Sequence, residues 1–231
     1  MSTFITDVGR LVSSEKFMGW LFEGFCKTIL ISVFAAFLGL IIGTLVAMIG
    51  VAGESPWLKV PKAICKVYVT VIRGTPMALQ LFIMAFVIFD IKGFPEEITA
   101  IIAFGINSGA YVSENIRAGI MSVDRGQTEA GRALGLSGKT TMIKIVIPQA
   151  IKNVIPAIGN ELIALIKETS IVSLVGIFDL TQASKVIGAG KNLSSYFVSM
   201  SAAACFYLAI VYLLTFAIKK VEKRLRSGDN R

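Results

Sequence analysis

Two long apolar stretches of this sequence contain polar residues at helical spacing. Asn107, Tyr111 and Glu114 share one stripe of a helix, because successive residues turn by about 100°. Glu161 lies in the next long apolar stretch. A carboxylate in apolar surroundings is costly unless it is paired or binds a ligand. A carboxylate can hold the ammonium group of a zwitterion, whose own carboxylate needs hydrogen-bond donors.

A broken helix can supply such donors. Pro76 has no N–H and clashes with the preceding turn, so Gly74–Pro76 predicts a bend or break in an apolar helix. Peptide groups freed by a break are tolerated where they line a wet cavity. Hydroxyl groups of Ser and Thr further along the chain are additional hydrogen-bond donors. The candidate ligand-binding residues are therefore Gly74, Thr75, Asn107, Tyr111, Glu114, Glu161, Thr169 and Ser170.

A structural role is the alternative for the charged residues, because charges inside a membrane usually pair. Arg117 follows Glu114 at i,i+3, and Lys167 lies between Glu161 and Glu168. For Arg117 and Lys167 we favour this pairing over a ligand role, while Arg73 also suits an arginine that reaches the membrane interface. The predicted structural ion-pair residues are Arg73, Arg117, Lys167 and Glu168.

The composition requires a membrane protein. Of the 231 residues, 55% are hydrophobic and 16% are charged, and the mean hydropathy is +0.74. Histidine is absent, which excludes histidine metal sites and Ser-His or Cys-His catalysis. Cys26, Cys65 and Cys205 have no metal-type spacing and suit small buried residues. The net charge of +8 is concentrated at the ends of apolar runs, so it does not indicate nucleic-acid binding.

Apolar runs of this length predict an all-α integral membrane protein with five spans. Basic residues concentrate in the connection 54–66, the interval 122–153 and the tail 219–231, so these segments are expected in the cytoplasm. The segment 1–27 is then periplasmic or interfacial, and the N-terminus lies outside. The five spans, which make up a transmembrane domain of residues 28–218, are about 28–53, 67–89, 98–121, 154–178 and 196–218.

The spans differ in polarity. The first and last contain no charged residue, so we expect the middle three to line an interior path. GxxxG patterns at Gly39–Gly43 and Gly105–Gly109 predict close helix packing, within the chain or against a second copy.

The basic interval 122–153 is patterned rather than a loose linker. Its first part has the spacing of a short helix with one apolar face, which Gly135 stops or bends. Ala133 to Thr140 nearly matches a phosphate-binding loop, but Ala133 replaces the first glycine and no strand precedes it. Nucleotide binding by this chain is therefore not expected. A short helix between membrane spans suits contact with another protein.

Three motifs carry a family resemblance. Glu129-Ala130-Gly131, Gly135 and Ile145 to Pro148 resemble the EAA motif of type I ABC-importer permeases, although Gly131 stands where that family usually has alanine. The departure is expected to loosen the start of the helix. Arg73-Gly-Thr-Pro76, Ala110 to Ile120 and Lys167 to Ser170 are similar to the polar amino acid branch, which serves histidine, arginine, glutamine, glutamate and opines.

The resemblance implies a permease subunit that is not itself an enzyme and holds no cofactor. ATP and Mg²⁺ would bind to two cytoplasmic ATP-binding subunits. The other implied partners are a second permease subunit, identical or related, and an extracytoplasmic amino acid-binding protein, at the bacterial inner membrane. The residues implied in coupling to the ATPase are Glu129, Ala130, Ala133, Leu134, Gly135 and Pro148.

Other functions stay open at this point. The chain alone could be an ion-coupled carrier or a channel, in which the carboxylates bind protons or sodium. A membrane scaffold without transport activity is disfavoured by the charged interior stripes. Within the importer class, an opine or methionine permease is a further alternative.

Overall fold

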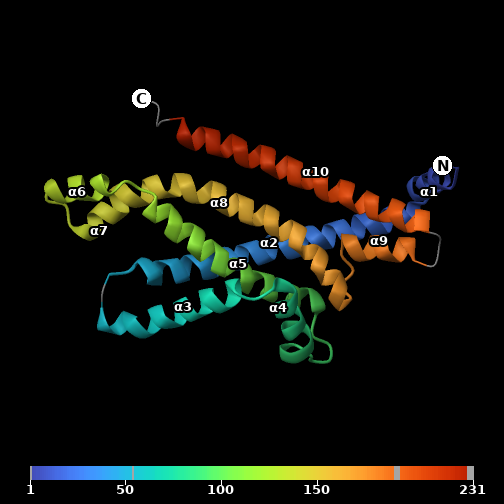
Figure 1. The fold of residues 1–231 in the computed structure, drawn as a ribbon, viewed down its shortest axis with the longest axis horizontal. Helices are drawn as coiled ribbons and strands as arrows, with labels where there is room; N and C mark the ends of the chain where they lie inside the picture. Colours follow the sequence, from blue (N-terminus) through green and yellow to red (C-terminus); the bar gives the residue numbers. More distant parts are fainter. Residues whose placement is uncertain (1, 54, 190–192, 228–231) are drawn as a thin grey trace. The chain divides into compact units, whose positions relative to one another are not determined.

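The computed structural model describes residues 2–53, 55–189 and 193–227, and all its regular elements in these ranges are helical (Figure 1). The all-α class is thereby confirmed. The first half contains α1 (Ser2–Ser13), α2 (Glu15–Val51), the 3₁₀-helix η1 (Pro56–Leu58), α3 (Lys59–Arg73), α4 (Met77–Ile83), the π-helix η2 (Met84–Ile88) and α5 (Glu96–Met121). The second half contains α6 (Arg125–Ala133), α7 (Gly138–Thr141), the π-helix η3 (Met142–Val146), α8 (Ile147–Glu168), the 3₁₀-helix η4 (Thr169–Val175), α9 (Leu180–Gly188) and α10 (Leu193–Arg226).

Among the described residues, three helical stretches are long and apolar enough to cross a membrane. These are Glu15–Val51, Gly138–Val175 and Ser195–Arg226, and a fourth arises if Pro56–Arg73 and Met77–Ile88 form one broken span. The predicted third span lies in α5, which is long enough but less apolar because it carries Asn107 and Glu114.

The predicted break at Gly74–Pro76 is present. Helix α3 ends at Arg73, α4 begins at Met77, and the two segments are bent by 107°. Thr75 Oγ1 donates to the carbonyl oxygen of Val71 at 2.9 Å, which ties the break to the last turn of α3. Proline at the break removes a backbone donor, so the helix cannot continue through it.

The contacts of the chain divide into two compact units. The first unit contains Met1–Ala35, Met77–Phe104 and Ile163–Leu213, and the second contains Ala36–Pro76, Gly105–Leu162 and Leu214–Arg231. Helices α2, α5, α8 and α10 each contribute residues to both units.

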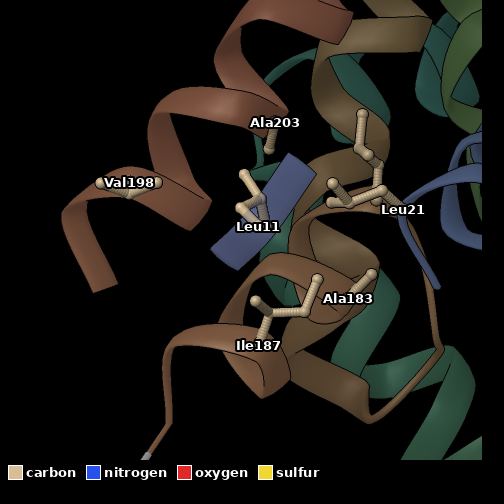
Figure 2. Packing of buried hydrophobic residues seen from close by; sticks show 7 residues of the cluster. Leu11, Leu21, Ala183, Ile187, Val198 and Ala203 are labelled. Atoms are coloured by element: carbon tan, nitrogen blue, oxygen red, sulfur yellow. The ribbon is translucent and has the colours of Figure 1, made fainter. Parts of the chain in front are cut away.

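The first unit has a core between its helices. Figure 2 shows Leu11 and Leu21 facing Ala183 and Ile187 of α9, with Ala203 of α10 nearby. The predicted spans 154–178 and 196–218 leave residues 179–195 as a connection between them, but part of this connection is the helix α9. Leu180, Ala183 and Ile187 recur at helical spacing and are buried, so the segment gains apolar burial by folding as a helix.

A buried polar group fixes the start of α9. Asp179 is fully buried and its Oδ1 accepts from the backbone N–H of Gln182 at 2.8 Å. Its Oδ2 accepts from the Tyr207 hydroxyl at 3.3 Å, and Thr28 Oγ1 accepts from the N–H of Leu180 at 3.2 Å. Burial raises the pKa of the Asp179 carboxyl, while the hydrogen bonds from Gln182 and Tyr207 oppose the rise.

In the second unit, the GxxxG motifs pack within the chain. A Cβ atom at Gly39 would lie 2.8 Å from Ser108 Cβ, and one at Gly109 would lie 2.8 Å from Ile42 Cγ2. Small residues therefore let α2 and α5 approach closely. The Tyr68 hydroxyl donates to the carbonyl oxygen of Ile106 and anchors α3 to α5.

Candidate functional site

The interval between α5 and α8 forms an ordered helical hairpin in the second unit. Asp124 begins α6, and its Oδ1 accepts from the N–H of Gly126 at 2.6 Å. Gly135 ends the helix with φ +78°. The N–H of Gly135 bonds to Arg132 O at 2.9 Å, and that of Leu136 bonds to Gly131 O at 3.1 Å. These two bonds are the Schellman pattern, which requires a left-handed residue where glycine is favoured.

Close packing of α6 on α7 shapes this hairpin. Gly131 is buried, and a Cβ atom there would lie 2.7 Å from Thr141 Cγ2. Thr141 is fully buried, and its Oγ1 donates to the carbonyl oxygen of Ser137 at 3.0 Å. Gly131 lies in the second half of α6, so it does not affect the start of the helix. Its missing side chain instead allows α7 to pack against α6.

The outer face of the hairpin exposes the residues of the motif. Glu129, Ala130 and Ala133 are exposed on α6, and Leu134 is 80% exposed. Pro148 is exposed near the start of α8, directly after the π-helix η3 and within the continuous helical stretch Gly138–Val175. An apolar side chain presented to this extent on a rigid turn is suited to a pocket of another protein.

A second group of predicted residues meets around the α3–α4 break. The Arg73 guanidinium lies over the Tyr111 ring, 5.3 Å from its centroid. Glu114 lies three residues further along α5, and Arg117 binds it through two contacts, of which Nε to Oε2 is 2.9 Å. Gly74 and Thr75 follow Arg73 directly and are exposed. The second unit therefore brings both charge signs, an aromatic ring and broken-helix peptide groups together.

Glu114 and Arg117 also line a cavity of about 340 Å³ in the second unit. Thr70 and Ser113 contribute hydroxyls to its wall. Sequence reasoning missed two further residues of this wall, Lys62 and Lys66. Their i,i+4 spacing was a usable signal, because it places both ammonium groups on one face of α3.

The other predicted residues lie elsewhere. Asn107 is buried in α5 and Glu161 is half-buried in α8, both in the second unit. Thr169 and Ser170 belong to the first unit, and their hydroxyls donate to Ile166 O at 2.7 Å and Lys167 O at 2.9 Å. The remaining two, Lys167 and Glu168, are exposed at the end of α8.

Known proteins resemble the chain over most of its length. Residues 39–227 match the family described as binding-protein-dependent transport system inner membrane component. The putative glutamine transport system permease protein GlnP of Rickettsia typhi is 40% identical over 209 residues, 89% of this chain and 93% of that protein. The arginine transport system permease protein ArtQ of Bacillus subtilis is 39% identical over 212 residues, 91% of this chain and 94% of that protein.

Two solved transporter structures are also similar to this chain over most of its length. The crystal structure of an amino acid ABC transporter with histidines has a chain that is 33% identical, with a TM-score of 0.81, covering 93% of this chain and 98% of that one. The methionine ABC transporter MetNI is 21% identical with a TM-score of 0.75, covering 92% of this chain and 99% of that one, and it supports the fold alone.

The chain therefore belongs to the family of binding-protein-dependent transport system inner membrane components, with the type I fold of ABC permeases. Within such a transporter it is the membrane permease, not an enzyme, and ATP hydrolysis takes place in a separate subunit.

Proposed function

We propose that this permease carries a polar amino acid across the bacterial inner membrane as part of an ATP-driven importer. Two relatives that match about nine-tenths of the chain are named glutamine and arginine permeases, and a third, from Bacillus subtilis, is named an L-cystine permease at 35% identity over 215 residues, 91% of this chain and 88% of that protein. The chain spans the membrane five times at about residues 28–53, 67–89, 98–121, 154–178 and 196–218. Its N-terminus lies outside, and its C-terminus lies inside.

The exposed hairpin is the observation that carries the coupling role. Leu134 projects from the end of α6 with 80% of its side chain exposed, beside Ala130 and Ala133. A channel or an independent carrier needs no such surface. Two permease subunits form the membrane part of the transporter, and each presents this hairpin to one of two ATP-binding subunits, which bind ATP and Mg²⁺. An extracytoplasmic receptor delivers the substrate to the opposite side of the membrane.

The charged group around the α3–α4 break is suited to a zwitterion. Glu114 offers a carboxylate for an ammonium group, and Arg117 and Arg73 offer guanidinium groups for a carboxylate. Gly74 and Thr75 lie next to Arg73 and belong to the proposed path, and the N–H of Gly74 already bonds to the carbonyl oxygen of Thr70 at 3.0 Å. Residues that also remain in the proposed path are Asn107, Tyr111, Glu161, Thr169 and Ser170.

Reconstitution in liposomes tests both the proposed amino acid transport and the proposed coupling to the ATPase. The permease, its ATPase and the binding protein are placed in liposomes, and uptake of labelled glutamine or arginine is measured with and without ATP. Leu134→Asp is expected to reduce transport-coupled ATP hydrolysis at least tenfold, because burying an unpaired carboxylate in an apolar pocket costs more than about 1.4 kcal/mol. Leu136→Asp, at a less exposed neighbour, is the matched control. Substrate flux through the permease alone would instead establish an independent carrier.

A further inference from the structure

The first helix of the chain, α1, is attached to the protein by one side only. On this side Leu11 is 7% exposed and Asp7 is 5% exposed, and Asp7 Oδ1 pairs with the Arg10 guanidinium at 3.7 Å. Leu11 belongs to the core of the first unit, where it faces Ala183 and Ile187 of α9 (Figure 2). The rest of the described surface of α1 is exposed.

Part of this exposed surface is apolar. Ile5 and Val12 are each 65% exposed, and Val8 is 36% exposed. At about 100° per residue, these three side chains lie within about 60° of one another around the helix axis, and we call them the apolar face of α1. Thr6 and Ser13 are also exposed and lie about 100° or more from the centre of this face. A helix with one apolar and one polar exposed side is typical of the membrane surface.

The apolar face of α1 continues into the surface of a candidate membrane span. Phe4 borders this face, and its ring contacts that of Phe197 with the two centroids 6.3 Å apart. Phe197 and its neighbour Tyr196 are both exposed, and they lie at the start of the candidate span Ser195–Arg226. Tyrosine is enriched where lipid meets water. The contact between the two rings therefore places the beginning of α1 at the border of the membrane.

The connection to the next helix places the other end of α1 at the same border. Helix α2 begins at Glu15, and a single residue, Ser14, separates it from α1. The candidate span Glu15–Val51 starts at this point. Both ends of α1 thus adjoin the first turn of a span, and a polar solvent leaves the apolar face of α1 between them without a favourable contact.

We propose that α1 binds the surface of the lipid bilayer, with its apolar face inserted at the boundary between headgroups and acyl chains. Helices of this kind typically insert about 5–10 Å into that boundary. Asp7 and Arg10 pair with each other, so α1 brings no excess charge to the surface, and apolar burial drives the contact. Because Leu11 also packs on α9, the bound lipid holds α9 at the membrane border. In the proposed orientation this is the outer leaflet, and the inference uses neither the substrate nor the coupling of the proposed function.

The accessibility of spin labels to collision reagents tests which side of α1 meets lipid. The assembled transporter is placed in phosphatidylcholine nanodiscs after its three native cysteines are changed by Cys26→Ser, Cys65→Ser and Cys205→Ser. Molecular oxygen concentrates in lipid, whereas the complex of nickel with ethylenediaminediacetate remains in water. The ratio of oxygen to nickel accessibility therefore reports the surroundings of each label.

Single labels are placed on the apolar face by Ile5→Cys, Val8→Cys and Val12→Cys, and on the polar side by Thr6→Cys and Ser13→Cys. We expect the accessibility ratio to be severalfold higher at all three positions of the apolar face than at the two polar positions. Equal ratios around the helix would place α1 in water and overturn the proposal. Low accessibility to both reagents on the apolar face would overturn it as well, because a protein partner would then cover this face.

Amide exchange of α1 in the same nanodiscs gives a second measurement without labels. Ile5→Asn/Val12→Asn should accelerate exchange in residues 2–13 at least about tenfold, because the lipid contact of two aliphatic side chains is lost. Ser13→Asn is the matched control, since it changes an exposed polar position of the same helix. Unchanged exchange in the double variant would contradict lipid contact. Neither measurement requires transport, so failure here is separate from failure of the proposed function.

Discussion

Gly131 gives the sharpest test of how the α6–α7 hairpin is built. In Gly131→Ala, the new methyl group would lie 2.7 Å from Thr141 Cγ2, 3.0 Å from Thr141 Oγ1 and 3.2 Å from Ile145 Cδ1. Non-bonded carbon atoms prefer about 3.5–4.0 Å. Thr141 cannot move away easily, because it is fully buried and its hydroxyl donates to Ser137 O.

Two opposing effects determine how strongly Gly131→Ala destabilises the hairpin. Overpacking of a buried contact costs about 1–3 kcal/mol, whereas alanine favours a helix over glycine by about 1 kcal/mol. The net result is a loss of about 1 kcal/mol in the local stability of the hairpin. Thr141→Ala in the same chain removes the two nearest of these atoms, Thr141 Cγ2 and Thr141 Oγ1. The double variant should therefore be more stable than the sum of the two single changes by about 1–3 kcal/mol.

Hydrogen–deuterium exchange of the hairpin amides in nanodiscs measures this directly. A loss of about 1 kcal/mol corresponds to roughly fivefold faster exchange in residues 125–141. Gly138→Ala is the matched control, because a Cβ atom there meets nothing within 4 Å. Unchanged or slower exchange in Gly131→Ala, or strictly additive effects with Thr141→Ala, would refute the packing argument.

Two further predictions concern the ends of helices. Gly135→Val forces a β-branched residue into φ +78°, which costs about 1–2 kcal/mol or more. Transport-coupled ATP hydrolysis should therefore be lost while membrane insertion persists. The control Gly138→Val, at a position with no positive φ, should retain coupling. Asp179 has a folded-state pKa raised by burial, so its contribution to stability is fully present below the unfolded pKa of about 4 and is lost as pH rises through the folded value. Asp179→Asn keeps a capping side chain and should remove this loss, so thermal unfolding of both proteins from pH 4 to 8 should show a difference that grows with pH. A difference that is constant, or that shrinks with rising pH, would contradict the burial argument.

The parts of the fold that depend on local chemistry were predictable. Pro76 has no donor and Gly135 requires a left-handed conformation, so each fixes a helix end regardless of its neighbours. The helix α9 was not predicted, because Asp179 and Lys185 make the segment read as a polar loop. Its helical state depends on the burial of Leu180 and Ile187 against residues far away in the sequence, which no local pattern reveals.

The sequence predicted which residue types form the candidate site, but not which of these residues lie next to one another in space. The stripe of Tyr111 and Glu114 follows from helical spacing alone. The position of Arg73 over Tyr111 depends on how α3 and α5 pack, so it required the structure. The cavity wall formed by Lys62 and Lys66 depends in the same way on the end of α2.

The ion pair between Glu114 and Arg117 is compatible with a role in transport. In this pair the Arg117 side chain is 47% exposed and the Glu114 side chain 28% exposed. Ion pairs with this degree of exposure contribute only about 0–1 kcal/mol, because water screens the two charges. A substrate ammonium group can therefore replace Arg117 at the Glu114 carboxylate with little loss. Under the proposed function, the displaced guanidinium group would then become a partner for the substrate carboxylate, so one pair of residues would serve both the empty path and a bound zwitterion.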